Sequence, residues 1–321
     1  MVQKSKISNL SELLKDCPSN WGRWGKDDEL GALNFLDNQE VLRGVKAVRQ
    51  GKVFTLQVPI GSPKGDPVWP GRSSAIRVNV NDKGYYIAGK NKPLYGGLEY
   101  ADDMIIMFLQ GTTQIDALGH TWYDDKIWNG YDANETIGGL SKASVFPIAQ
   151  KGIVGHGILI DVAWCKGVEA LQAGEEITLN DLIECSKKEG IEIQKHDILL
   201  IRTGWIAQFF KKGPEEFYKN FLEPGLTYRK EVVDWFYKME IPMLGTDTIA
   251  NERTTHPETG IYLPLHAALM RNLGIVLNEI LWLEDLAEDC RKDGQWDFLY
   301  AGAPLKIYKA TGAPINPIVI K

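Results

Sequence analysis

Short apolar runs that alternate with amphipathic segments constrain the fold of this chain more than any other feature. Residues 153–162, 198–205 and 274–279 are rich in β-branched and other apolar side chains and have no consistently polar face. Such runs are typical of strands that are buried on both sides, in a sheet covered by helices. Residues 179–188 and 231–237 carry the helical spacing of apolar positions that covering helices need. The order of strands and helices therefore predicts an α/β fold.

The first fifty residues differ from the rest of the chain. Residues 8–49 are predicted to be helical, with an interruption at Cys17-Pro18, and strand-like patterns follow them. Residues 74–80 alternate apolar and polar side chains, which indicates a half-buried strand. We therefore expect a single domain overall, in which a helical segment formed by residues 1–50 packs on the core formed by residues 51–321.

Composition and charge exclude several classes of protein. The 321 residues carry a net charge of −6, which argues against nucleic acid as a partner because nucleic-acid-binding surfaces are basic. No run approaches the roughly 18 apolar residues of a membrane span, and the first residues lack the apolar core of a signal peptide. The four cysteines are scattered and form no C-x-x-C pair, so neither a disulfide framework nor a zinc ribbon is indicated. We expect a cytoplasmic protein that contacts neither nucleic acid nor a membrane.

The stretch Q-G-T-T-Q-I-D-A-L-G-H, residues 110–120, concentrates polar side chains directly after an apolar run. Residues 104–109 are predicted to be a buried strand, and residues 84–87 a shorter strand before it. Gln, Asp and His side chains at the end of such a strand could bind a metal ion or move a proton. From the residue types alone, an ordinary loop with Asp116 as a helix N-cap is the more economical interpretation.

This stretch resembles the signature H-x-G-T-H-x-D-x-x-x-H of the cyclase-like metal-dependent hydrolases, a family that includes bacterial kynurenine formamidases, isatin hydrolases and trans-dienelactone hydrolases. Asp116 and His120 match the signature. Gln110 and Gln114 stand where the family has two metal-binding histidines. The resemblance implies that Gln110, Gln114 and Asp116 bind a metal ion. It also implies that His120 transfers protons, with Asp116 beside it at the catalytic centre.

The resemblance covers most of the chain. The segments 23–34, 283–290, 303–307 and 312–318 follow the family pattern in order and at similar spacing. The resemblance implies the swivelling β/β/α fold of the family, with a mixed, partly barrel-like central sheet. It places the site at the end of the strand that finishes near Leu109. It also implies a homo-oligomer, either a dimer or a tetramer.

The same resemblance places a helix–strand unit near the end of the chain on the opposite side of the site. Pro264 begins the helix, which carries His266, and Glu279 ends the strand. His266 is the implied additional metal ligand. Glu279 is implied either to support the ligands from behind or to hold a second metal ion.

Aromatic residues gather in two segments that the family places near the entrance of the site. The members are Trp21, Trp24, Trp122, Tyr123 and Trp128. They are candidates for the wall of a pocket that stacks against a planar cyclic substrate. For Trp21 and Trp24, burial in the core or at an interface is the alternative, because large aromatic side chains are mostly buried for their area.

The resemblance implies a hydrolase that opens a small cyclic amide, imide or lactone, or cleaves a related amide or ester. A divalent metal ion would activate water. His120 would pass the proton to the leaving group, a role that suits its unperturbed pKa of about 6.5. Glutamine offers a neutral carbonyl oxygen, which suits harder ions, so Zn²⁺ and Mn²⁺ are both candidates. The absence of a G-x-S-x-G elbow argues against a serine hydrolase.

We expect one metal ion and not two, because the 110–120 stretch brings a single negative charge, that of Asp116, and Glu279 is expected to lie farther away. Two alternatives to a metal-dependent hydrolase stay open. The first is a metal-free lyase or cyclase that uses His120 and Asp116 as acid and base. The second is a small-molecule-binding protein that keeps the fold without turnover.

Overall fold

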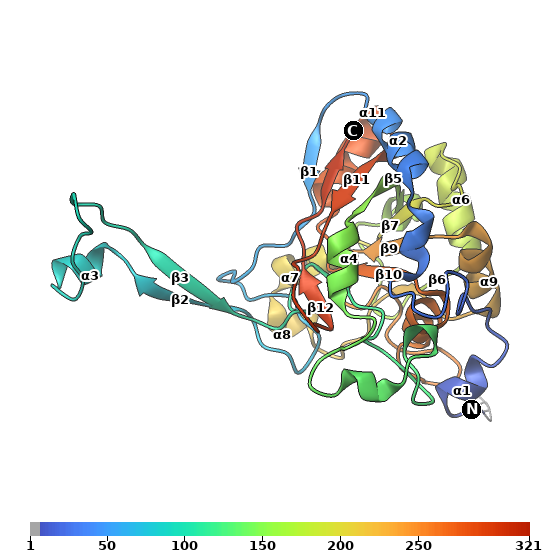
Figure 1. Ribbon diagram of the computed structural model, residues 1–321. Coiled ribbons are helices and arrows are strands. Elements are labelled where there is room, and N and C mark those ends of the chain that lie inside the picture. Colours follow the sequence, from blue (N-terminus) through green and yellow to red (C-terminus); the bar gives the residue numbers. More distant parts are fainter. Residues whose placement is uncertain (1–6) are drawn as a thin grey trace.

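The computed structural model describes residues 7–321 and contains one nine-stranded mixed sheet that curls like half a barrel (Figure 1). In spatial order the strands are β1 (Val53–Thr55), β13 (Ile318–Ile320), β11 (Asp297–Gly302), β5 (Ile153–Asp161), β7 (Ile198–Arg202), β9 (Met243–Thr246), β10 (Val276–Glu279), β4 (Gln114–Asp116) and β12 (Gly312–Pro314). The four central strands β5, β7, β9 and β10 run parallel, and the outer strands pair antiparallel. The prediction of an α/β fold with a mixed, partly barrel-like sheet is confirmed.

The central strands are buried, as their apolar composition predicts. Every residue of β7, β9 and β10 is buried. Helix α2 (Asn38–Ala47) packs on β5 and β11, and helix α6 (Leu179–Glu189) packs on β5. A capping box begins α6: the Thr178 hydroxyl accepts a hydrogen bond from Asp181 N, and the Asp181 carboxylate accepts one from Thr178 N. The predicted helix at 179–188 is therefore confirmed.

The remaining elements connect the strands. The helical ones are α1 (Leu10–Leu13), η1 (Gly31–Phe35), η2 (Trp128–Gly130), η3 (Ala133–Thr136), α4 (Val145–Lys151), α5 (Val162–Cys165), α7 (Trp205–Lys212), α8 (Pro214–Phe217), α9 (Lys230–Met239), α10 (Pro264–His266), the π-helical turn η4 (Ala267–Leu273) and α11 (Glu284–Asp293). The predicted helix at 231–237 corresponds to α9. Strands β6 (Glu176–Ile177) and β8 (Gly225–Leu226) form a separate parallel pair. No helix among residues 7–321 is long and apolar enough to cross a membrane.

The N-terminal segment docks on the turn that leads into β10. Ala32 N donates a hydrogen bond of 2.7 Å to Gly274 O. Gly31 has a φ of +57°, and a Cβ atom at this position would lie 2.3 Å from Gly274 O. Only glycine therefore permits the close approach of the two backbones. This contact holds the start of β10, the strand that ends at Glu279.

Two predicted strands do not belong to the central sheet. β2 (Ile76–Asn81) and β3 (Asp102–Ile106) pair antiparallel in a ribbon that projects from the body of the protein (Figure 1). Every residue of β3 is exposed, and β2 is mostly exposed. The prediction of a buried strand at 104–109 is therefore wrong, because an apolar run is compatible with burial without showing what covers it. The strand also ends at Ile106, before Leu109.

The tip of this ribbon contains a helical turn. Residues 84–87, predicted to be a strand, belong to helix α3 (Lys83–Ile87). The Asp82 carboxylate accepts a hydrogen bond of 2.8 Å from Gly84 N and so caps the first turn. In the sequence, Asp82 is the signal for a helix start. The strand preference of the aromatic residues Tyr85 and Tyr86 led to the wrong prediction.

His156 on β5 lies in a network of ion pairs with acidic residues beside β7 and on β11. Its Nδ1 atom is 2.7 Å from Asp197 Oδ1, and its Nε2 atom is 3.6 Å from Asp297 Oδ2. Arg43 also pairs with Asp197. Burial lowers the pKa of His156, but the two carboxylates outweigh burial and raise it above its usual value. These contacts hold the His156 imidazole within the fold, which indicates a structural role.

We expect His156→Gln to lower the free energy of unfolding by about 1–2 kcal/mol at pH 5.5. The pKa of His156 is higher in the folded protein than the unfolded value of about 6.5. Its contribution is therefore complete below about pH 6.5 and is lost as the pH rises through the folded-state pKa. Urea unfolding of both proteins between pH 5.5 and pH 9 measures the difference. A difference that grows with pH would contradict this account.

Candidate metal centre

Strand pairing brings two predicted site residues face to face. β10 pairs antiparallel with β4, so that Glu279 lies directly opposite Gln114. The Gln114 amide donates a hydrogen bond to the Glu279 carboxylate, and both side chains are buried. Asp116 follows Gln114 by two residues along β4 and therefore lies on the same face of the strand. Two carboxylates and one amide thus share a single buried space.

His266 enters this space from α10. Glu252 accepts hydrogen bonds from the backbone N–H groups of Leu265 (2.9 Å) and His266 (2.5 Å), which fixes the first turn of the helix. The imidazole Nε2 atom lies 3.6 Å from Asp116 Oδ2 and 3.4 Å from Glu279 Oε1. The Nδ1 atom lies 3.5 Å from Glu252 Oε1. The ring of His266 is therefore surrounded by three carboxylates.

Asp116, His266 and Glu279 form what we call the buried cluster. One ligand atom from each lies within 4.8 Å of the others. Asp116 Oδ1, Glu279 Oε1 and the neighbouring Gln114 Oε1 are buried without a hydrogen-bond partner among residues 7–321. Each buried acceptor left unpaired costs about 1–3 kcal/mol, so such groups are rare in folded proteins. A divalent cation would satisfy all three oxygens at once, and these residue types fit Zn²⁺ or Mn²⁺.

The charges of the buried cluster also favour a cation. Burial, together with Asp116, raises the pKa of Glu279 well above its usual value. Burial alone would lower the pKa of His266, but the neighbouring carboxylates raise it to about 10. Burial raises the pKa of Asp116, but electrostatic interactions with His120, His266 and Arg72 lower it overall. The charged form is therefore favoured more at Asp116 than at Glu279, and a metal ion would compete with protons for the cluster.

His120 follows Asp116 by four residues and is close enough to it for the two side chains to shift each other's pKa. The backbone N–H of His120 donates a hydrogen bond of 2.8 Å to Ala117 O, which turns the chain after β4. Burial lowers the pKa of His120, and Asp116 opposes this shift. A neutral imidazole next to a carboxylate can accept a proton, because the carboxylate stabilises the imidazolium that forms.

Gln110 is held at the border of the buried cluster. Its Nε2 atom donates a hydrogen bond of 2.8 Å to Thr311 Oγ1, and its backbone oxygen accepts one of 2.8 Å from Arg72 Nη1. Thr311 precedes β12, in which Gly312 pairs with Asp116. The pairing of β12 with β4 therefore brings Gln110 next to the buried cluster. Among residues 7–321, the Gln110 side chain forms no hydrogen bond with Asp116, His266 or Glu279. Metal binding by Gln110 stays a prediction.

Sequence reasoning missed three charged residues around the buried cluster. Arg72 lowers the pKa of both Asp116 and Glu279. Glu252 holds the backbone and ring of His266, as described above. Burial raises the pKa of Glu223 to about 8, and Glu223 in turn contributes to the raised pKa of Glu279. None of the three carries a local signal, because each lies in a polar or Pro/Gly-rich loop without periodic spacing.

Two of the predicted pocket tryptophans contribute to the hydrophobic core. Trp128 is fully buried, and Trp24 packs against it with a distance of 6.4 Å between ring centroids. The Trp128 Nε1 atom donates a hydrogen bond of 3.2 Å to Asp28 O. These contacts attach the N-terminal segment to the loop that follows the 110–120 stretch.

The other aromatic residues lie at the surface around Arg271. The guanidinium carbon of Arg271 is 4.6 Å from the centroid of Trp21 and 3.7 Å from that of Tyr123. These three side chains line a shallow depression of about 320 Å³. Trp122, the neighbour of Tyr123 in sequence, is exposed. Contact between the predicted aromatic residues and a substrate stays a prediction.

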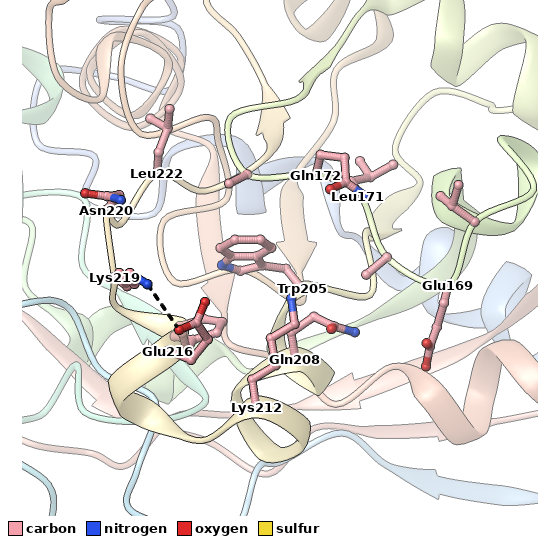
Figure 2. Close-up of a pocket in the computed structure, with 14 residues that line it drawn as sticks. Glu169, Leu171, Gln172, Trp205, Gln208, Lys212, Glu216, Lys219, Asn220 and Leu222 are labelled. Carbon is pink, nitrogen blue, oxygen red and sulfur yellow. Dashed lines mark ion pairs between the residues drawn. The ribbon is translucent and has the colours of Figure 1, made fainter.

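A separate cavity of about 460 Å³ opens beside α7 and α8 (Figure 2). The Trp205 indole lies at its centre, surrounded by the amide side chains of Gln172, Gln208 and Asn220. No residue of the buried cluster lines this cavity. The cavity is therefore distinct from the candidate metal centre.

Comparison with known proteins agrees with this geometry. A family model described as "Putative cyclase" matches residues 54–253, which is more than half of the chain. A solved structure described as a novel cyclase is 33% identical, with a TM-score of 0.86 over 95% of this chain and 98% of that chain. The chain belongs to the cyclase family. The family resemblance inferred from the 110–120 stretch is therefore confirmed.

More distant cyclase-family structures share the fold. Isatin hydrolase A from Labrenzia aggregata is 20% identical, with a TM-score of 0.56 over 86% of this chain and 94% of that chain. Isatin hydrolase A from Ralstonia solanacearum is 17% identical, with a TM-score of 0.59 over 84% and 91%. A predicted metal-dependent hydrolase from Bacillus stearothermophilus is 18% identical, with a TM-score of 0.51 over 84% and 98%. A search of the curated proteins finds no match.

We expect Zn²⁺ or Mn²⁺ to stabilise chelator-treated protein through the buried cluster. At a metal concentration 100 times the Kd, the gain is about 2.7 kcal/mol, which corresponds to a rise in Tm of about 5 °C. Asp116→Asn and Glu279→Gln should each remove most of this rise. Glu189→Gln is the matched control, because Glu189 is a buried carboxylate on α6 with one unpaired oxygen, outside the cluster. Thermal unfolding with elemental analysis measures the effect, and an equal rise in all four proteins would place the metal elsewhere.

Proposed function

We propose that this cyclase-family protein is a metal-dependent hydrolase that opens a small cyclic amide, imide or lactone, or cleaves a related amide or ester. The observation that carries the proposal is the buried cluster, in which Asp116 and Glu279 each have an unpaired oxygen atom, together with the unpaired oxygen of the neighbouring Gln114. The isatin hydrolases and the predicted metal-dependent hydrolase with the same fold support a hydrolytic reaction. A homo-oligomer in the cytoplasm, acting on a small molecule, is part of the same proposal.

The buried cluster would hold one divalent ion, Zn²⁺ or Mn²⁺, with Gln114 Oε1 as a further ligand. Such an ion, when bound, polarises a carbonyl group and lowers the pKa of water. Glu279 lies closer to Asp116 than the sequence led us to expect, so two carboxylates are available to balance the dication. Gln110 would join the ligands through its Oε1 atom, while its Nε2 atom keeps the hydrogen bond to Thr311.

His120 is proposed as the proton shuttle. Because burial lowers its pKa, the imidazole is neutral near pH 7 and can take a proton from the attacking water. Asp116 stabilises the imidazolium that results. The same imidazolium then donates the proton to the leaving nitrogen or oxygen. Arg72, whose positive charge reaches Asp116 and Glu279, is placed to offset the negative charge that develops on the substrate oxygen.

Glu252 is proposed as a positioning residue for His266. Its carboxylate lies 3.5 Å from His266 Nδ1, so it favours the tautomer that carries the proton on Nδ1 and leaves Nε2 free toward Asp116 and Glu279. Carboxylate–histidine pairs of this kind fix the orientation of histidine ligands.

We expect His120→Ala to lower kcat by about 10²–10⁴-fold, the usual contribution of general acid–base catalysis, and to leave metal content unchanged. His196→Gln is the control, because His196 pairs with Glu40 and Glu240 at the surface. A screen of small lactones, cyclic imides and amides supplies the substrate for this measurement. Wild-type turnover by His120→Ala would assign the residue a structural role.

The same screen distinguishes the alternatives. Loss of turnover after chelation, with recovery on adding Zn²⁺ or Mn²⁺, is expected for the proposed hydrolase. Full turnover after exhaustive chelation would favour the metal-free lyase that uses His120 and Asp116. Binding of the same compounds without any turnover would favour the small-molecule-binding protein.

We expect Glu252→Gln to weaken metal binding by about 10–100-fold, because the ring of His266 loses its charged partner. The glutamine has one oxygen in place of two, so it keeps only one of the hydrogen bonds from Leu265 N and His266 N. Equilibrium titration with a metal-sensitive dye measures the affinity, and far-UV circular dichroism checks the fold. Unchanged affinity would mean that packing alone orients His266.

A further inference from the structure

The cavity of about 460 Å³ beside α7 and α8 lies where two central parallel strands end. β5 ends at Asp161 and β7 at Arg202, and segments that follow these two strands line the cavity. Ligands of α/β proteins commonly bind at the carboxyl ends of parallel strands. The volume also falls within the range of about 300–1,000 Å³ that is usual for small-molecule sites. Position and size therefore favour a ligand site, which we call the Trp205 cavity.

One wall of the Trp205 cavity is fixed by backbone contacts. Leu171 N donates a hydrogen bond of 2.9 Å to Thr203 O. Gly204 has a φ of +76°, and a Cβ atom at this position would lie 2.3 Å from Glu169 O. Only glycine therefore permits the close approach of the two segments. These contacts hold the loop that follows α5 against the turn that begins α7, so the cavity is preformed.

An aromatic surface lines this cavity. The Trp205 indole lies among the other lining side chains (Figure 2), and Phe217 packs against it with 5.2 Å between ring centroids. Both aromatic residues are buried, so their neighbours hold the two rings in place. Aromatic rings favour stacked or edge-to-face contacts with other flat rings. A fixed indole inside a cavity therefore favours a ligand with a flat ring.

Three side-chain amides surround the indole, those of Gln172, Gln208 and Asn220 (Figure 2). Within the described residues 7–321, none of these three side chains forms a hydrogen bond. A side-chain amide offers two N–H donors and one acceptor oxygen. The edge of a cyclic amide or imide places a C=O beside an N–H, so it matches such groups as both donor and acceptor.

One positive charge at the Trp205 cavity is unbalanced. Glu169 pairs with Lys211, and the Glu216 carboxylate lies 3.7 Å from Lys219 Nζ. Lys212 also lines the cavity, and in the described part of the chain it forms no ion pair. Hydrogen bonds between charged groups are roughly twice as strong as neutral ones. The free ammonium group therefore favours a ligand with one negative charge, such as that of a carboxylate.

We propose that the Trp205 cavity binds a small flat ring that carries a cyclic amide or imide edge and one carboxylate group. The ring stacks on the Trp205 indole, its amide edge meets the surrounding side-chain amides, and its carboxylate pairs with Lys212. No residue of the buried cluster lines this cavity. The cavity is thus a second ligand site, and the inference does not rest on the proposed hydrolytic reaction or on a metal ion.

Nuclear magnetic resonance of ¹⁵N-labelled, chelator-treated protein tests this proposal. Each of the ten tryptophans has its own indole N–H signal, and Trp205→Phe identifies the signal of Trp205. The probe is orotate, a flat cyclic imide with one carboxylate. We expect orotate to shift the Trp205 signal in a saturable way, with a Kd below about 1 mM. Uracil lacks the carboxylate and benzoate lacks the imide edge, so each should bind about 10-fold more weakly or less.

Substitutions at the cavity distinguish specific from nonspecific binding. Lys212→Ala should weaken orotate binding by about 10–100-fold and Gln208→Ala by about 3–10-fold, because each removes a hydrogen-bonding partner. Lys238→Ala, which changes an exposed lysine on α9, is the matched control and should leave the Kd unchanged. Asp116→Asn should also leave it unchanged, because the buried cluster takes no part. The other indole signals verify that each variant is folded.

Three results would each overturn the proposal. The first is the absence of any shift of the Trp205 signal up to the solubility limit of orotate. The second is equal affinity for orotate, uracil and benzoate, which would contradict the ligand class. The third is an orotate Kd that neither Lys212→Ala nor Gln208→Ala changes. Because the protein is free of metal in this experiment, its outcome is independent of whether the proposed hydrolysis occurs.

Discussion

The burial of two carboxylates side by side is the constraint on which the site depends. Asp116 and Glu279 lie on paired strands, with one oxygen of each unpaired and His266 between them. Like charges brought out of water cost several kcal/mol unless a cation or a proton compensates them. The raised pKa of Glu279 reflects this cost, because burial and Asp116 disfavour its charged form. The raised pKa of His266 reflects the attraction between its imidazolium and the carboxylates. A site that must hold either protons or a metal ion is suited to the water-activating chemistry we propose.

The rest of the fold keeps these groups in place. β10 continues the buried parallel strands, and its start is fixed by the contact between Gly31 and Gly274. Glu252 places His266 through the backbone of α10 as well as through its ring. Residues remote in sequence therefore meet at the cluster on rigid elements, which is the arrangement that precise metal coordination requires.

Gln114 stands where the resemblance implies a histidine, and this difference changes which hydrogen bonds and ligand atoms the position offers. Its NH₂ group donates to Glu279, which leaves Oε1 as an unpaired acceptor in the same buried space. A histidine could also donate from one ring nitrogen and bind an ion with the other, but it would offer a nitrogen ligand in place of an oxygen. The amide thus orients the second carboxylate while it offers a neutral ligand atom. If the proposed metal ion binds here, Gln114 would supply an oxygen ligand at the position where the resemblance implies a histidine.

The sequence alone determined the α/β class, the buried strands β5, β7 and β10, and the capped helix α6, because apolar periodicity and capping are local properties. Its family resemblance also brought Asp116, His266 and Glu279 into one site. Only the tertiary structure decided that residues 104–106 stand exposed on an arm, that Gln110 turns to Thr311, and that Glu252 and Arg72 adjoin the cluster. An apolar run does not say which surface covers it, and a polar loop residue does not say which distant group it meets. Both depend on strand pairing and chain crossings that no local pattern encodes.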